Sequence, residues 1–99
     1  MPYYVYILLC ADGSFYTGYT GDLKRRFKQH QSGSIPRSYT KSRRPVELVW
    51  AGEFQTKGEA RANEKKIKRW KPERKKDLIR EDKNQTAQIF ENEGGKRNK

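Results

Sequence analysis

Residues 3 to 20, "YYVYILLCADGSFYTGYT", constrain the fold more than any other stretch of the chain. Two aromatic and β-branched runs flank the short loop "CADGS", which contains Asp12-Gly13. Such runs around an Asp-Gly turn signal predict a β-hairpin.

The length of the loop sets an expected register for this hairpin. If Leu9 faces Phe15, antiparallel pairing places Tyr6 opposite Gly18. Because side chains alternate along a strand, Tyr6 and Tyr16 then lie on one face of the sheet. Gly18 has no side chain and leaves space over which the ring and hydroxyl of Tyr6 can approach a ligand. The alternative is a cross-strand aromatic pair that serves only packing.

A helix and a third strand are expected after the hairpin. Asp22 can cap the first turn of a helix, and Gly33 can end it. A basic, turn-rich loop follows, "SIPRSYTKSRRP". The near alternation of Val, Leu, Trp and Phe in "VELVWAGEF", residues 46 to 54, predicts the third strand.

Two more helices are expected near the end of the folded region. Thr56-Lys57-Gly58-Glu59 matches a capping box, which predicts a helix that runs to about Trp70. Pro72 disfavours helical dihedrals at Lys71 and suits a new first turn, so a short third helix should reach about Arg80.

The order β-β-α-β-α-α implies a small three-stranded antiparallel sheet flanked by helices, an α+β architecture. A chain of 99 residues has room for one domain. We assign residues 1 to 82 to this domain. Residues 83 to 99, "KNQTAQIFENEGGKRNK", have only Ile89 and Phe90 as large apolar residues, and we expect them to form a polar, disordered tail.

The charge balance points to a phosphate-rich partner. The chain has 23 Lys and Arg against 12 Asp and Glu, a net charge of +11. This excess favours nucleic acid, without separating DNA from RNA. No segment approaches the roughly 20 apolar residues of a membrane span, so no membrane partner is expected. The lone Cys10 allows no internal disulfide, which makes the cytoplasm the default location.

Two basic segments are candidate contacts for the nucleic-acid backbone. Residues 57 to 76 contain ten Lys or Arg and three Glu, and residues 37 to 44, "RSYTKSRR", add four cations around Tyr39. The candidate binding residues are Tyr19, Lys24, Arg37, Tyr39, Lys41, Arg43, Arg44, Lys65, Lys68 and Arg69.

On the first helix, the 100° rotation per residue places Arg26 and His30 on the apolar face defined by Leu23 and Phe27. Arg25 points to solvent by the same geometry. Arg26 and His30 can therefore reach a common site. The alternative is that the arginine extends along the rim and that His30 is a core histidine with satisfied hydrogen bonds.

The second helix places a carboxylate on its apolar face, because Glu64 lies between Ala60 and Ile67 at helical spacing. A buried carboxylate needs a cation or a hydrogen-bonded partner. One interpretation is an internal ion pair with Arg26 or a lysine. The other is a ligand for Mg²⁺ or Mn²⁺, which take carboxylate oxygens and often only one or two protein ligands.

Together these elements resemble the GIY-YIG nuclease superfamily. "YVY" (4 to 6) and "YTG" (16 to 18) stand in the places of its two signature tripeptides, "DLKRRFKQH" is similar to its Arg-x-x-x-His helix, and "EARANEKKIKRW" to its glutamate helix. The likeness covers about residues 3 to 80 and is greatest to the small, stand-alone bacterial members, whose biological role is not established. The chain has Tyr4 where the first tripeptide begins with Gly, and no obvious counterpart of a late Asn that some members carry.

The resemblance implies hydrolysis of a DNA phosphodiester with one bound Mg²⁺ or Mn²⁺. It assigns catalytic roles to Tyr6, Tyr16, Arg26, His30 and Glu64. Glu64 would hold the metal, and Arg26 would contact the phosphate. Tyr6 would act as base or proton relay and Tyr16 would orient water or phosphate, with the reverse assignment as the alternative; His30 would hydrogen-bond one of these hydroxyls.

No base-reading helix and no second specificity domain is evident, so structure-directed or weakly specific cleavage is expected, in DNA repair or recombination. The main rival is a non-catalytic module that binds DNA or RNA and retains the nuclease fold. A small RNA- or ribosome-associated protein is a third interpretation.

Overall fold

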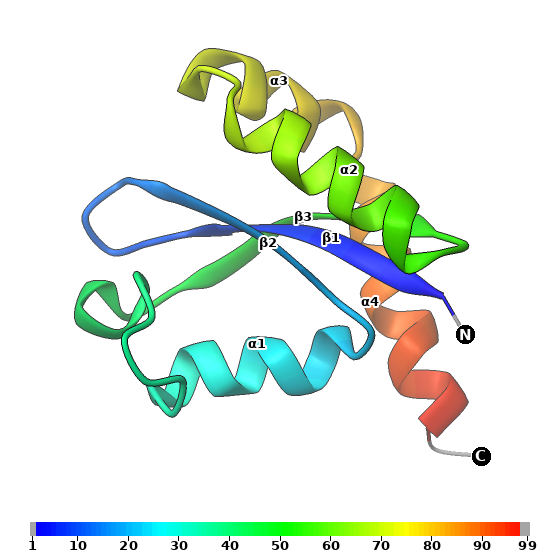
Figure 1. The fold of residues 1–99 in the computed structure, drawn as a ribbon, viewed down its shortest axis with the longest axis horizontal. Helices are drawn as coiled ribbons and strands as arrows, with labels where there is room; N and C mark the ends of the chain where they lie inside the picture. Colours follow the sequence, from blue (N-terminus) through cyan, green and yellow to red (C-terminus); the bar gives the residue numbers. More distant parts are fainter. Residues whose placement is uncertain (1, 98–99) are drawn as a thin grey trace.

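The computed structural model describes residues 2–97 of the chain, and the side chains of residues 2–92. The elements in chain order are β1 (Tyr3–Leu9), β2 (Phe15–Thr20), α1 (Leu23–Ser32), the short 3₁₀ helix η1 (Lys41–Arg43), β3 (Glu47–Phe54), α2 (Lys57–Lys68), α3 (Pro72–Glu81) and α4 (Lys83–Arg97). The α+β architecture predicted from the sequence is confirmed, with a fourth helix added (Figure 1).

The sheet has the strand order β2-β1-β3, with both pairs antiparallel. Leu9 pairs with Phe15 and Tyr6 with Gly18, which is the register predicted from the loop length. On the other side of β1, the pairing with β3 is shifted between Ile7 and Leu8. The middle strand is therefore β1, and it carries Tyr6.

The helix ends follow the capping signals in the sequence. The Asp22 carboxylate accepts a hydrogen bond from the backbone N–H of Arg25, and Gly33 ends α1 with φ of 72° in the left-handed region. Thr56 and Glu59 form both hydrogen bonds of the capping box at the start of α2. Pro72 lies in the first turn of α3, as predicted.

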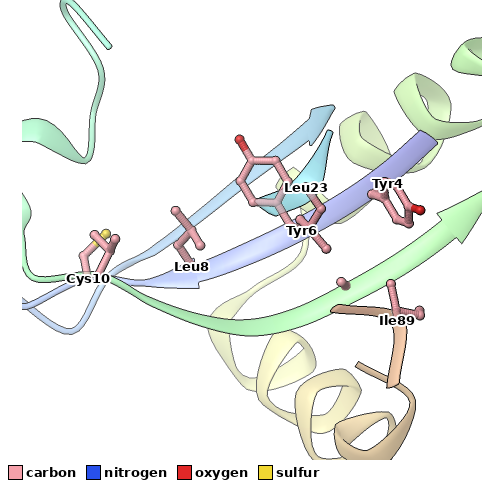
Figure 2. Packing of buried hydrophobic residues seen from close by; sticks show 8 residues of the cluster. Tyr4, Tyr6, Leu8, Cys10, Leu23 and Ile89 are labelled. Atoms are coloured by element: carbon pink, nitrogen blue, oxygen red, sulfur yellow. The ribbon is translucent and has the colours of Figure 1, made fainter. Parts of the chain in front are cut away.

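The two faces of the sheet are covered by different helices (Figure 1). Tyr4, Tyr6 and Leu8 of β1 pack on one face with Leu23 of α1 and Ile89 of α4 (Figure 2). This face contains the Tyr6 side chain.

The opposite face packs against α2 and α3. Val5 and Ile7 of β1 lie there with Trp50 of β3 and with Ala60 and Ile67 of α2. Alternate side chains of β1 thus pack in the two hydrophobic clusters on opposite faces of the sheet. Because both faces of β1 are buried, its apolar run is continuous.

The segment from residue 83, expected to be a disordered tail, continues as helix α4. Ile89 is 9% exposed, and the Phe90 ring meets Phe27 edge-on at 6.0 Å between centroids. The backbone N–H of Ala51 donates to the Thr86 hydroxyl at 3.1 Å. A few contacts therefore hold a mostly polar helix against β3 and α1. That residues 1–82 fold by themselves stays a prediction.

Within residues 2–97, none of the helices is both long and apolar enough to cross a membrane.

Candidate active site

Tyr6 is at the centre of the candidate site. Its side chain is 1% exposed and its ring crosses the edge strand β2 at Gly18. A Cβ atom at Gly18 would lie only 2.6 Å from the Tyr6 hydroxyl oxygen. The glycine therefore provides the space that the sequence predicted, because any larger residue would displace the hydroxyl.

His30 binds the Tyr6 hydroxyl from α1. Its Nε2 lies 2.9 Å from the Tyr6 oxygen, and its Nδ1 lies 2.7 Å from the hydroxyl of Thr40. Burial, with the nearby positive charge of Arg26, lowers the pKa of His30 to about 4. The imidazole is therefore neutral at pH 7, with one nitrogen that carries a proton and one that does not.

The Tyr6 hydroxyl is a phenol rather than a phenolate at neutral pH. Burial raises its pKa well above the usual range, and the neighbouring Tyr16 adds to this rise. The positive charge of the nearby Arg26 acts in the opposite direction. A role of Tyr6 in proton transfer must therefore begin from the protonated hydroxyl.

Tyr16 lies beside this pair on the same face. Its ring centroid is 6.3 Å from that of Tyr6 and 5.1 Å from that of His30. Its other neighbour is Tyr39, stacked at 6.1 Å with 20° between the ring planes. The Arg43 guanidinium lies 3.8 Å from the centre of the Tyr39 ring. A path of aromatic rings thus leads from the buried Tyr6 to the exposed, basic loop.

Arg26 reaches the site from the helix face predicted for it, whereas Arg25 is exposed. The Arg26 Nε donates to the Gln29 side-chain oxygen at 3.1 Å. Both arginines border a cavity of about 350 Å³ at the start of α1, which is lined by Thr20, Gly21, Asp22, Arg25, Arg26 and Gln29.

Glu64 is 7% exposed on α2, as the helical period predicted. Its Oε2 lies 2.7 Å from Nζ of Lys68, one turn further on. Its negative charge contributes to the raised pKa of Tyr6, although α2 packs on the opposite face of the sheet. Tyr6 extends over the edge strand β2 at Gly18, and α2 also contacts that strand.

The donor set fits a divalent cation that keeps most of its water. Among the side chains of residues 2–92, no three His, Cys, Asp or Glu residues form a metal cluster. Mg²⁺ is commonly held by one or two carboxylates together with waters and substrate phosphates. A single buried carboxylate such as Glu64 meets that requirement, provided that Lys68 moves away from it.

Eight of the ten predicted nucleic-acid-binding residues lie in two groups, and the other two lie elsewhere. Arg37, Tyr39, Lys41, Arg43 and Arg44 lie on the loop from α1 to β3, next to Tyr16 through Tyr39. Lys65, Lys68 and Arg69 lie exposed on or just after α2.

The two exceptions, Lys24 and Tyr19, lie apart from these groups. The Lys24 ammonium lies 4.5 Å from the centre of the Phe90 ring of α4. Tyr19 packs with the apolar cluster under α2. The structure therefore does not bring these two residues to the basic loop.

Thr40 and Ser38 were missed by sequence reasoning. Thr40 is 1% exposed and binds His30, and its hydroxyl lies 2.9 Å from that of Ser38. A short polar residue in a turn-rich loop carries no periodic signal of burial, so the sequence gives no means of singling it out. Lys75 was also missed; it is buried on α3, and burial with the nearby charge of Lys68 lowers its pKa.

A separate cavity of about 790 Å³ lies between α1, β3, α3 and α4; its lining combines charged residues with apolar side chains such as Phe27, Leu48, Ile79 and Phe90. None of the five predicted catalytic residues borders it.

A comparison with family models covers most of the chain. Residues 2–77 match the model of the GIY-YIG catalytic domain. The chain belongs to the GIY-YIG family. Membership places it in a nuclease superfamily and supports DNA as the kind of substrate.

Similar GIY-YIG proteins are small bacterial chains of uncharacterised function. A UPF0213 protein of Bacillus pumilus is 49% identical over 80 residues, which are 81% of this chain and 80% of that protein. A UPF0213 protein of Staphylococcus saprophyticus is 46% identical over 79 residues, which are 80% of this chain and 95% of that protein. The suspected likeness to small single-domain members is thereby confirmed.

Two solution NMR structures share the fold. That of a UPF0213 protein from Bacillus halodurans has a TM-score of 0.51 and 46% identity, covering 80% of this chain and 83% of that one. That of a protein from E. faecalis has a TM-score of 0.50 and 36% identity, covering 92% and 88%.

Proposed function

We propose that this GIY-YIG protein is a divalent-metal-dependent endonuclease that hydrolyses DNA phosphodiester bonds. The observation that carries the proposal is the buried Tyr6 hydroxyl, which is hydrogen-bonded to a neutral His30. The charges of Arg26 and Glu64 both act on its pKa. A phosphodiesterase needs a proton acceptor for water, a cation for the phosphate and a carboxylate for a metal; Tyr6 with His30 supplies the first, Arg26 the second and Glu64 the third.

The hydrogen bond between Tyr6 and His30 supports a role for Tyr6 as a proton relay, rather than as a base that is already deprotonated before the reaction. The attacking water oxygen forms a bond to phosphorus while its proton passes to the Tyr6 oxygen. Tyr6 gives its own proton to Nε2 of His30, so the hydroxyl stays neutral, and the imidazolium of His30 releases that proton to solvent after cleavage. The bond from phosphorus to the 3′ oxygen breaks, and that oxygen takes a proton from solvent. Tyr16, next to both rings, orients the water or the phosphate.

Charge on the phosphate is stabilised from two sides. Arg26, near the start of α1, supplies the planar N–H donors of its guanidinium to a phosphate oxygen. Glu64 holds the Mg²⁺ or Mn²⁺ ion, which when bound supplies a Lewis acid for the phosphate and the leaving oxygen.

The basic surface explains the expected substrate preference. Cations on the loop 34–46 and on α2 suit the phosphate backbone, and backbone contacts carry little sequence information. We therefore propose structure-directed or weakly specific cleavage in DNA repair or recombination, in the cytoplasm, with RNA as the alternative polymer.

The test is cleavage of linear, flapped and branched DNA with Mg²⁺ or Mn²⁺. We expect Tyr6→Phe and Glu64→Gln each to lower the rate by about 10²-fold or more. Tyr3→Phe and Glu53→Gln, the same changes at residues outside the site, should leave it unchanged. Cleavage that survives Glu64→Gln at the wild-type rate would overturn the metal assignment.

A non-catalytic binding module is the second candidate, because the ion pair between Glu64 and Lys68 already explains the buried carboxylate without a metal. Wild-type protein that binds DNA or RNA with a steep salt dependence but cuts none of these substrates would establish it.

A further inference from the structure

Thr40 forms the far end of a chain of hydrogen bonds that begins at Tyr6. It precedes η1 and is 1% exposed. Its hydroxyl oxygen lies 2.7 Å from Nδ1 of His30 and 2.9 Å from the hydroxyl of Ser38. The Ser38 oxygen also accepts a hydrogen bond from the Thr40 backbone N–H at 3.3 Å. The hydroxyl and the backbone N–H of Thr40 both hydrogen-bond to Ser38, which holds the Thr40 side chain in place. The loop thus presents the Thr40 hydroxyl to Nδ1, the ring nitrogen of His30 that is remote from Tyr6.

The chemistry of the donors sets the direction of these bonds. Of the two hydroxyls that flank the His30 ring, the phenol of Tyr6 is the stronger donor and the weaker acceptor, so Tyr6 donates to the ring and Thr40 accepts from it. The Tyr6 proton is then directed to Nε2 of His30, the acceptor within hydrogen-bonding distance. A neutral imidazole that accepts at Nε2 carries its proton on Nδ1. Nδ1–H therefore donates to Thr40, and the Thr40 hydroxyl donates to Ser38.

We propose that Thr40 is a positioning residue that holds His30 in the Nδ1–H tautomer and so keeps Nε2 free to receive the Tyr6 proton. Thr40 acts through His30 and does not contact the phosphate. In the other tautomer, Nε2–H would point at the Tyr6 oxygen, and Tyr6 would have no acceptor at His30 for its proton. The effect on cleavage rests on the proposed nuclease function, whereas the tautomer itself does not.

The chain offers an unusually clear measurement, because it contains a single histidine. In ¹⁵N-labelled protein at pH 7, two-bond correlation spectra of the ring identify which nitrogen is protonated. We expect wild type to show a protonated Nδ1 and an unprotonated Nε2. A wild-type spectrum with the proton on Nε2 would overturn the proposal before any variant is made.

Three variants separate positioning from packing. Thr40→Val keeps the shape of the side chain but removes the acceptor, so His30 should shift toward the Nε2–H tautomer. Thr40→Ser keeps the hydroxyl and should retain the wild-type spectrum. Thr17→Val is the matched control, because Thr17 is 3% exposed and its hydroxyl oxygen has no hydrogen-bond partner within the described part of the chain. A Thr40→Val spectrum identical to that of Thr17→Val would contradict the proposal.

Cleavage assays then test the consequence for the reaction. Thr40→Val should lower the rate constant of cleavage at least 10-fold with little change in DNA affinity, and Thr40→Ser should restore it. If Thr40→Val does not fold, the wild-type and Thr40→Ser spectra still decide the tautomer. If wild type cuts no DNA yet shows the Nδ1–H tautomer, the proposed function fails and the role of Thr40 in orienting His30 stands.

Discussion

At the residue scale, the burial of His30 makes the stability of the folded chain depend on pH. The unfolded chain binds a proton at His30 below about pH 6.5, whereas the folded chain binds it only below about pH 4. Between these values the unfolded state holds more protons, so the free energy of unfolding rises with pH. The stabilising contribution is complete above pH 6.5 and is lost as the pH falls toward 4.

This contribution amounts to at most about 3 to 4 kcal/mol, since one pKa unit corresponds to about 1.4 kcal/mol. Urea unfolding at pH 7, 5.5 and 4.5 measures it, and His30→Gln should remove most of the slope in that range. Titration of the histidine ring by NMR with an ordinary pKa near 6.5 would contradict the expectation.

Individual residues differ in how far the sequence reveals their roles. Glu64 and His30 were found because a polar residue at helical spacing among apolar ones must be buried. Tyr6 was found because the loop length fixes its partner, Gly18. Thr40 was not found, since its burial depends on how an irregular loop folds over α1. Periodicity identifies side chains on helices and strands, and it is silent on loops.

At the scale of elements, the pairing of β1 with β2 leaves space for the Tyr6 ring at one position, Gly18. In Gly18→Ala the new Cβ atom would meet the Tyr6 hydroxyl at 2.6 Å, and relief of this contact requires a shift of the buried Tyr6 ring. We expect a loss of stability of about 1 to 3 kcal/mol and a broken hydrogen bond to His30, visible in the histidine ring signals.

Gly58→Ala is the matched control for this change. The nearest atom to a Cβ at Gly58 is 4.0 Å away, and the residue lies in the first turn of α2. Alanine there should be neutral or stabilise by up to about 1 kcal/mol. Equal effects of the two substitutions would contradict the special role of Gly18.

Helix α2 carries both the carboxylate and the cation that competes for it. In Lys68→Met the ammonium 2.7 Å from Glu64 is lost, so the carboxylate is open to a divalent ion. We expect the affinity for Mn²⁺ without DNA to rise about 2- to 5-fold, in line with the 0.5 to 1 kcal/mol of a half-exposed ion pair. Electron paramagnetic resonance of free Mn²⁺ measures it. Lys65→Met, on the same helix, should bind as wild type does, and equal affinities of both variants would refute the competition.

At the scale of the whole molecule, α4 covers a core that other elements already form. Sequence reasoning missed this helix because two apolar residues among 17 give no helical period, and its burial follows from the shape of β3 and α1.

We therefore expect a chain ending at residue 82 to fold with the Tyr6–His30 hydrogen bond intact. It should lose about 2 to 4 kcal/mol of stability, from the burial of Ile89 and Phe90 and the hydrogen bond between Thr86 and Ala51. Urea unfolding of the two lengths, with the histidine ring signals as reporter, measures the loss. An unfolded 1–82 chain would show that α4 is required.

The central position of β1 also sets how solvent reaches the buried hydroxyls. Both edges of β1 are paired, so its amides should exchange with deuterium only when the sheet opens as a whole. Thr40 belongs to a loop between α1 and β3, and such connections open at a lower free energy. Deuterium should therefore enter the Tyr6–His30–Thr40 path from the loop, while the strand that carries Tyr6 remains closed.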